Sequence, residues 1–236
     1  MEDYVYNISE KDKCWYKNIC DGSRCGEAFC IRHYKMDCLT HMALMEGKQK
    51  YPIPLILDSD GTDRDAYVFL KNIQADISNF VKNGKNLLIY SERTGNGKTE
   101  WAKKLMLSWF DSIWSTTDFG CRGLFISVPR LMKAMKDNIT SPSEYFQYID
   151  DNILDADLVV WDEINCKEYT QFEHDYLLSI LSQRLSQGKS NIYTTNFSLP
   201  IINNKLGSRL SSRIVGESIH VEFRGTDKRS WGVANG

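Results

Sequence analysis

The sequence predicts an α/β fold with a five-stranded parallel sheet, preceded by a small cysteine-rich module. Three observations support this class: short apolar runs alternate with helical patterns, a glycine-rich loop follows the first run, and five of the seven cysteines lie before residue 39. Alternating strands and helices are typical of βαβ units in a parallel sheet. The expected strands are residues 87–90, 123–128, 158–161, 191–195 and 218–223.

The glycine-rich stretch SERTGNGKT, residues 91–99, has the layout of a phosphate-binding P-loop. It joins a buried strand to a helix, so backbone N–H groups and the positive end of the helix dipole can surround an anion. Lys98 would reach the terminal phosphates, and the Thr99 hydroxyl would bind Mg²⁺. The predicted nucleotide contacts are Thr94, Gly95, Asn96, Gly97, Lys98, Thr99 and Glu100.

One position departs from the full pattern GxxxxGK[ST], because Glu92 occupies the place of the first glycine. A carboxylate beside a triphosphate is unfavourable unless it turns away, so Glu92 is expected to weaken nucleotide binding without abolishing it.

Helices are expected on both sides of the P-loop strand and later in the chain. One is expected at residues 66–81, one after Thr99 and a long one at 168–187, its buried face formed by Tyr169, Phe172, Tyr176, Ile180 and Leu185.

Polar residues that end two later strands supply the rest of a nucleotide-hydrolysing site. The third expected strand ends in Asp162 and Glu163, and the fourth is followed by Asn196. Asp162 is predicted to bind Mg²⁺ through water, while Glu163 orients and activates the attacking water. Asn196 would contact the γ-phosphate and that water.

Arginines in the C-terminal part suit phosphate contacts. Arg209 and Arg213 are four residues apart, which places them on one helical face. In an oligomer, one of them can reach a neighbouring subunit's nucleotide and neutralise developing charge. Arg229 follows the last expected strand and is predicted to contact the nucleotide within its own chain.

The cysteine-rich segment is predicted to bind a metal, since a short loop-like segment buries little apolar area and a zinc site supplies folding energy of roughly 10 kcal/mol or more. The spacing does not follow the familiar CxxC pairs. An iron–sulfur cluster is the alternative to zinc, and cysteines packed without a metal are a third possibility. The predicted ligands are Cys14, Cys20, Cys25 and Cys30, with His33, Cys38 and His41 as alternates.

Composition and length bound the organisation of the chain. Its 236 residues are 42% hydrophobic, enough for one large domain and a small appendage. Prolines in YPIP at residues 51–54 mark the boundary between a module at 1–50 and a P-loop domain at 51–236. A net charge of −2 gives no global attraction to nucleic acid. The polar N-terminus and the lack of a long apolar run predict a cytoplasmic protein without membrane contact.

The order of these motifs over residues 72–231 resembles the AAA+ ATPases, and within them the DnaC/DnaI-like helicase loaders. The resemblance rests on GNGKT, FISVP, VVWDE, YTTN, LGSRLSSRI and the basic segment around Arg229. It implies an ATPase using ATP and Mg²⁺, with Lys98 and Thr99 as Walker A, Asp162 and Glu163 as Walker B, Asn196 as sensor 1, Arg213 or Arg209 as arginine finger and Arg229 as sensor 2.

The same resemblance implies partners. A loader of this kind assembles as a homo-oligomer in ATP and places a hexameric replicative helicase on single-stranded DNA, and its N-terminal zinc module grips the helicase. Two alternatives stay open. One is an IstB-like transposition ATPase acting on duplex DNA, and the other is a nucleotide-binding adaptor that scarcely turns over, for which Glu92 is the best support.

Overall fold

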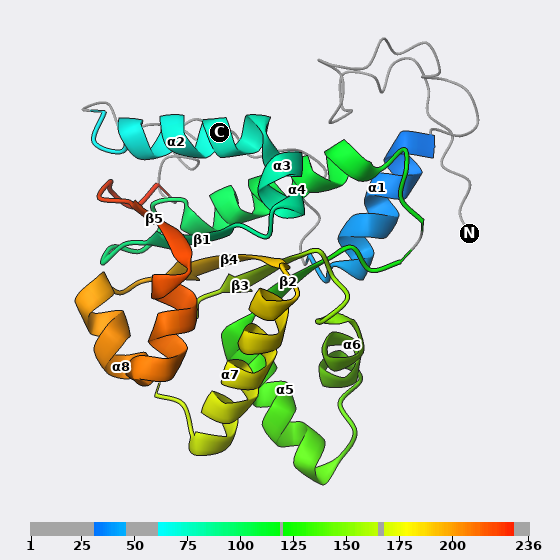
Figure 1. Ribbon diagram of the computed structural model, residues 1–236, viewed down its shortest axis with the longest axis vertical. Coiled ribbons are helices and arrows are strands. Elements are labelled where there is room, and N and C mark those ends of the chain that lie inside the picture. Colours follow the sequence, from blue (N-terminus) through cyan, green and yellow to red (C-terminus); the bar gives the residue numbers. More distant parts are fainter. Residues whose placement is uncertain (1–30, 46–60, 119, 165–167, 229–236) are drawn as a thin grey trace.

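The computed structural model describes residues 31–45, 61–118, 120–164 and 168–228. Its centre is one sheet of five parallel strands in the order β2-β3-β4-β1-β5 (Figure 1). The predicted α/β class and five-stranded parallel sheet are confirmed. The strands are β1 (Asn86–Tyr90), β2 (Gly123–Ser127), β3 (Leu158–Asp162), β4 (Ser190–Thr195) and β5 (Ser218–Glu222), all within two residues of their predicted bounds.

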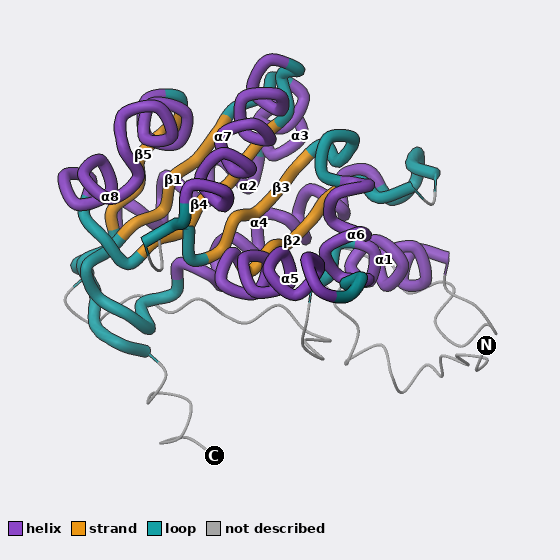
Figure 2. Tube along the Cα trace, turned by 90° about the horizontal axis from the view of Figure 1, so that it is seen from below, coloured by secondary structure: helices purple, strands orange, loops and turns teal. Residues whose placement is uncertain are grey.

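Helices cover both faces of the sheet, which lies between two helical layers in Figure 1 and is seen from one of its faces in Figure 2. Each face carries its own apolar cluster of buried side chains. One face is covered by α1 (Ile31–Met42), α2 (Arg64–Ala75), α3 (Ile77–Lys82) and α4 (Lys98–Ile113). The other is covered by α5 (Val128–Thr140), α6 (Glu144–Asn152), α7 (Gln171–Ser186) and α8 (Leu199–Ser211), with a π-helical turn at Ser212–Gly216.

Burial on both faces explains why the strands are continuous apolar runs rather than alternating ones. Every residue of β4 is buried, and β1, β2 and β3 are buried in four of their five positions. The edge strand β5 has one buried residue, Val221, because fewer elements cover it. The central strands therefore hold their carboxyl ends at one rigid edge, which is where the polar residues predicted for the site lie.

Helix α1 packs on the core, although it falls within the predicted N-terminal module. Met36, Leu39 and Ala43 are buried in the same apolar cluster as α4. The Phe125 N–H donates to the Ala43 carbonyl at 2.7 Å, so the chain after α1 covers part of the open edge of β2. The predicted ligands Cys14, Cys20, Cys25 and Cys30 lie outside the described residues. The metal-binding module remains a prediction.

The single helix expected at residues 66–81 was wrong, since the structure has two helices that meet at Asp76. The expected buried face of α7 was partly wrong, since Ile180 is buried as expected but Tyr169, Tyr176 and Leu185 are only half-buried. Phe172 is 59% exposed, whereas Glu173 and Arg184 are fully buried. Thr170 and Glu173 form a capping box, which fixes the start of α7 and turns Glu173 inward. The residues of α7 that are buried are Glu173, Leu177, Ile180, Leu181 and Arg184.

Candidate nucleotide-binding site

The P-loop runs from the end of β1 to the start of α4 and is held by its own side chains. Gly95 and Gly97 have positive φ values of 71° and 101°, a conformation that favours glycine. The buried Asn96 donates through Nδ2 to Ser91 Oγ at 2.7 Å, which ties the two ends of the loop together. Glu92 is exposed and lacks a positive φ, so the backbone at this position does not require glycine.

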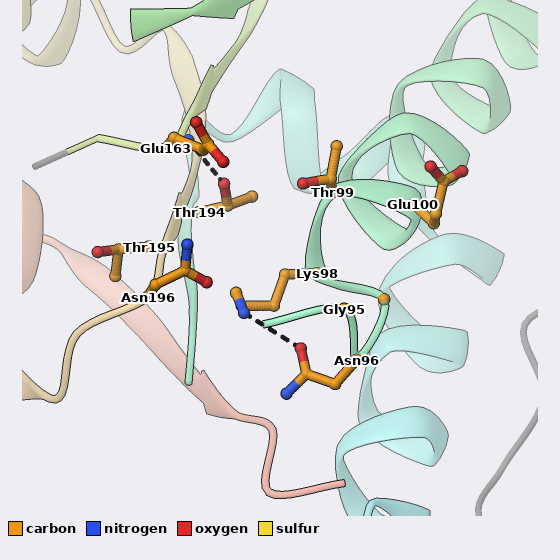
Figure 3. A pocket seen from close by; sticks show the side chains of 10 residues that line it. Gly95, Asn96, Lys98, Thr99, Glu100, Glu163, Thr194, Thr195 and Asn196 are labelled. Atoms are coloured by element: carbon orange, nitrogen blue, oxygen red, sulfur yellow. Dashed lines mark hydrogen bonds between the residues drawn. The ribbon is translucent and has the colours of Figure 1, made fainter. Parts of the chain in front are cut away.

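Lys98 opens α4 and lies with its ammonium group inside the curve of the loop (Figure 3). Its Nζ donates to the Arg93 carbonyl at 2.7 Å and to Asn96 Oδ1 at 3.1 Å. The residue is only 6% exposed, so the positive charge is held at a fixed place. Together with the N-terminus of a sixteen-residue helix, it makes the loop suitable for an anion.

A hydroxyl of the P-loop helix is hydrogen-bonded to the end of β3. Thr99 Oγ1 donates to Asp162 Oδ1 at 2.9 Å, and Thr194 Oγ1 of β4 donates to the same oxygen at 2.6 Å. Burial raises the pKa of Asp162, and the two hydroxyl donors oppose that shift. Thr99 and Asp162, which are each predicted to take part in binding Mg²⁺, thus lie within hydrogen-bond distance of each other.

Glu163 stands directly after β3 in a left-handed conformation, with φ of 56°. Such a φ is uncommon for a residue with a side chain and costs on the order of 1 kcal/mol or more. The Glu163 N–H donates to Thr194 Oγ1 at 2.9 Å, and this bond holds the turn. Thr194 therefore positions both acidic residues, donating to Asp162 and accepting from Glu163.

Lys98, Thr99, Glu163 and Thr194 border one hollow of about 170 Å³. Asp162 is hydrogen-bonded to Thr99 and Thr194 but does not itself line the hollow. Figure 3 shows Glu163, Thr194 and Asn196 on one side and Lys98 and Thr99 on the other. Thr94 is exposed and does not line the hollow. The lining residues are Gly95, Asn96, Gly97, Lys98, Thr99, Glu100, Glu163, Thr194, Thr195 and Asn196.

The chain that follows β5 crosses the P-loop. The Lys228 N–H donates to the Gly95 carbonyl at 2.9 Å. The buried Asp63 carboxylate accepts the N–H groups of Arg224 and Gly225 at 2.7 and 3.0 Å, which holds this segment in place. The Asp227 carboxylate packs so closely on Gly95 that a Cβ there would overlap it.

No local pattern in the sequence predicts that this segment contacts the P-loop. Asp63 precedes a helix and looks like an ordinary cap, and its partners lie about 160 residues further along the chain. Thr194 ends β4 and looks like an ordinary strand residue in the sequence, while its hydroxyl contacts Asp162 and Glu163 about 30 residues earlier in the chain. The roles of Asp63 and Thr194 are visible only in the folded chain, where segments distant in the sequence come into contact.

Other predicted residues are not gathered at the hollow. Arg209 is exposed on α8, and Arg213 Nε donates to Ser182 Oγ at 3.3 Å on α7. A break at Gly207 and the π-helical turn interrupt the regular helix expected for the two arginines. Arg229 lies outside the described residues. Within the described ranges no group of three or more His, Cys, Asp or Glu side chains could hold a metal, so Cys38 and His41 form no such cluster there.

The donor set at the hollow fits a magnesium nucleotide. A buried ammonium and loop N–H groups suit phosphate oxygens, while a hydroxyl and a carboxylate held 2.9 Å apart are oxygen ligands of the kind Mg²⁺ takes. The fold and the site together resemble those of P-loop proteins of the AAA+ type, with an acidic pair at the end of β3, which β4 separates from the P-loop strand β1.

This chain is similar in part of its sequence to bacterial helicase loaders. No protein-family model matches the sequence. The chain is 28% identical over 108 residues to the replicative helicase loader DnaC of Escherichia coli (strain K12), and to the same protein of Shigella flexneri. The matched residues are 45% of this chain and 44% of the relative, so less than half of the curated relative is spanned.

Solved structures establish the fold. The DnaC helicase loader superposes with a TM-score of 0.56 over 69% of this chain and 90% of the other, at 18% identity. DnaI gives 0.55 over 73% and 88%, at 18% identity. The replication initiator DnaA bound to AMPPCP and single-stranded DNA gives 0.57 over 76% and 51%, again at 18%. The predicted resemblance to DnaC/DnaI-like AAA+ proteins is confirmed. None of the helices in the described ranges is long and apolar enough to cross a membrane.

Proposed function

We propose that this protein is an ATP-dependent DNA replication protein that loads a hexameric replicative helicase onto single-stranded DNA. The observation that carries the ATPase part is the hydrogen-bonded chain from Thr99 through Asp162 and Thr194 to Glu163. It joins the P-loop helix to the ends of two strands and fixes an acidic pair opposite Lys98. The loader part rests on the likeness to proteins named as helicase loaders.

The described side chains have distinct tasks in hydrolysis. Lys98 and the loop N–H groups bind the phosphates, and Thr99 and Asp162 would hold Mg²⁺, whose charge neutralises phosphate oxygens. Glu163 is exposed to the hollow and accepts a hydrogen bond from the attacking water, which it orients toward the γ-phosphate. Asn196 lies beside Thr195 at the same edge and contacts that water or the γ-phosphate (Figure 3).

Arginines complete the site in the assembled protein. Arg229 follows Lys228, whose N–H is bonded to the P-loop at Gly95, and this proximity in the chain supports a contact to the nucleotide. Arg209 and Arg213 are the two candidates for a contact to the nucleotide of a neighbouring copy. Arg209 is exposed, whereas Arg213 contacts Ser182 of its own chain. We therefore infer a homo-oligomer that forms when ATP is bound.

The test of this function is native mass spectrometry of the protein with the replicative helicase of its own organism, with ATP and without it. We expect several copies per helicase hexamer in the presence of ATP. A Lys98→Ala variant serves as the control that separates nucleotide dependence from simple contact.

Two other results would change the assignment. Assembly with ATP on duplex DNA, without any helicase complex, would contradict loading and favour a transposition ATPase of the IstB type. A helicase complex that forms equally with the Lys98→Ala variant, combined with negligible ATP turnover, would favour a binding adaptor. Metal analysis of the purified full chain, with each cysteine replaced in turn, tests the predicted zinc module separately.

A further inference from the structure

Helices α2 and α4 bring two lysines together on the face of the sheet opposite to α5 and α7. The two helices are in contact, and Figure 1 shows α2 on the outer side of α4. Lys71 of α2 and Lys104 of α4 both lie over the indole ring of the buried Trp101, with their Nζ atoms 6.0 and 5.1 Å from the ring centroid. An indole ring attracts an ammonium group but does not neutralise its charge. Neither lysine lines the nucleotide hollow.

No carboxylate of the described chain balances these two charges. Among the described residues, neither Lys71 nor Lys104 has an acidic group within ion-pair distance. Glu100, one turn before Lys104 on α4, contacts Lys103 at 3.4 Å. Asp65, the acid within α2, lies about 120° from Lys71 around the helix axis. Two like charges are therefore held together without a counter-charge from the described part of the protein.

The acid–base behaviour of Lys104 reflects this arrangement. Its side chain is half-buried, and burial, followed by the charge of Lys71, lowers the pKa of Lys104 to about 8. Both causes disfavour the charged form of the ammonium group. A bound anion would favour the charged form and raise the pKa again. The pair of lysines is thus stabilised by a negative group supplied from outside.

The exposed side of α2 extends the pair into a line of positive charge. Arg64 lies seven residues before Lys71, two turns away on the same helical face and roughly 10 Å along the axis. Both residues are exposed, and so is Val68 between them. One small anion cannot contact both ends of this line, whereas a nucleic-acid strand repeats its negative charge along its length. Arginine and lysine are common protein partners of its phosphate oxygens.

We propose that Lys71 and Lys104 bind one backbone phosphate of single-stranded DNA, and that Arg64 contacts a neighbouring phosphate of the same strand. The contacts are independent of base sequence, because phosphates carry no base information. This inference rests on the proposed function for the kind of strand, and it assigns the surface along which that strand lies.

The affinity of the full-length protein for a fluorescent oligothymidylate, measured by anisotropy at several salt concentrations, tests this surface. We expect Lys71→Gln/Lys104→Gln to weaken binding about tenfold at low salt. The slope of log affinity against log salt should become shallower by about 0.7, the value for one phosphate contact on a single strand. Lys82→Gln/Lys85→Gln is the matched control, since it removes two exposed lysines outside the line, and it should bind like the parent. Thermal unfolding verifies that both variants are folded.

The Lys104 ammonium group provides a second readout that does not depend on a loss of affinity. Its pKa is followed by NMR of the side-chain carbon next to it, assigned by the loss of that signal in Lys104→Gln. Saturating oligothymidylate should raise the pKa of Lys104, while inorganic phosphate at the same concentration of phosphate groups should leave it near 8.

Four results would overturn the proposal. They are a parent protein that does not bind the oligothymidylate, a folded Lys71→Gln/Lys104→Gln that binds like the parent, a control pair that weakens binding equally, and a pKa that rises only with inorganic phosphate. The last result would indicate a site for free phosphate. Helicase and ATP are absent from these measurements, so a failure to form the helicase complex, with DNA binding intact, would reject the proposed loading function alone.

Discussion

Two polar regions lie at opposite ends of the same strands, and they differ in whether their polar groups are fully hydrogen-bonded within the protein. In the interior near the start of β4, Arg184 is wholly buried and donates to the carbonyls of Ile153, Ala156 and Ser190 and to Asn191 Oδ1. That network needs nothing from outside. At the carboxyl ends, Lys98 is held by a loop carbonyl and an amide, and Glu163 has a strained backbone.

The difference separates polar groups that stabilise the fold from polar groups that are left to bind a ligand. A buried cation surrounded by four acceptors fixes the packing of α7 against the sheet, whereas the groups beside the P-loop are arranged around a hollow. We expect substitutions at the first region to change stability and substitutions at the second to change nucleotide binding.

Lys98→Ala should have the largest effect on binding. Truncating one partner of a buried charge pair costs ~2–5 kcal/mol, so ATP affinity should fall roughly a hundredfold. Stability should change little, because the Lys98 contacts are local. Titration calorimetry with Mg-ATP measures the affinity, and Lys85→Ala, at an exposed lysine outside the loop, should bind like the parent. Unaltered affinity in Lys98→Ala would show that the loop does not bind the phosphates.

Arg184→Met should give the largest loss of stability. Burial lowers the pKa of Arg184 to about 10, so the side chain is still charged at neutral pH. Its removal leaves buried acceptors without donors, which should cost ~3 kcal/mol in the free energy of unfolding. Urea denaturation measures this cost, with Arg64→Met on the exposed side of α2 as control. If the remaining folded protein also lost ATP affinity, the two regions would not be independent.

Asp162→Asn should separate stability from function at a single residue. Burial raises the pKa of Asp162 in the folded protein, so the folded state holds this proton more tightly than the unfolded state. Stability is therefore lost as the pH rises from the unfolded pKa through the folded one, and the ionised carboxylate is a cost at pH 7. The amide keeps the Oδ1 acceptor for Thr99 and Thr194 and removes that charge.

Without nucleotide, the melting temperature of Asp162→Asn should exceed that of the parent by a few degrees at pH 7, and the difference should vanish at acid pH. Affinity for Mg-ATP should fall about tenfold, since a magnesium ligand is lost. Scanning calorimetry at several pH values checks the first effect, and Asp151→Asn is the exposed control. A lower melting temperature at pH 7 would contradict the sign of the pKa shift.

Asp227→Asn should have the smallest effect, and in the opposite direction. The Asp227 carboxylate lies against Gly95 and repels an approaching triphosphate, so its neutralisation should tighten ATP binding a few-fold. Glu92→Gln is the matched comparison, because it neutralises an exposed carboxylate of the same loop and should change affinity less. A larger gain from Glu92→Gln would mean that the departure from the P-loop pattern, not the crossing segment, limits affinity.

Much of the fold could be predicted because local pattern determines it. Buried parallel strands are continuous apolar runs, and Gly95, Gly97 and Lys98 identify the loop between a strand and a helix. The helix expected after Thr99 is confirmed as α4, and its buried face includes Trp101, Leu105 and Trp109, which recur at four-residue spacing.

The sequence did not predict the residues whose burial or hydrogen bonds depend on distant parts of the chain. Arg184 is buried only because four acceptors from other segments meet it, and no periodicity predicts that. The inward turn of Glu173 does have a local signal, the Thr170-x-x-Glu173 capping box, but the spacing of apolar residues alone does not include it. Asp63 and Thr194 act on chain segments far from their own, so their contributions to the site became visible only in the folded chain.

Glu163 is proposed to activate water for ATP hydrolysis, and this role is tested by comparing ATP binding with ATP turnover. ATP binding and steady-state ATP turnover are measured in parallel for the parent and Glu163→Gln. We expect Glu163→Gln to bind ATP like the parent and to lose nearly all turnover, which leaves the ATP-bound assembly trapped. Retained turnover in a variant that still binds ATP would contradict this role of Glu163.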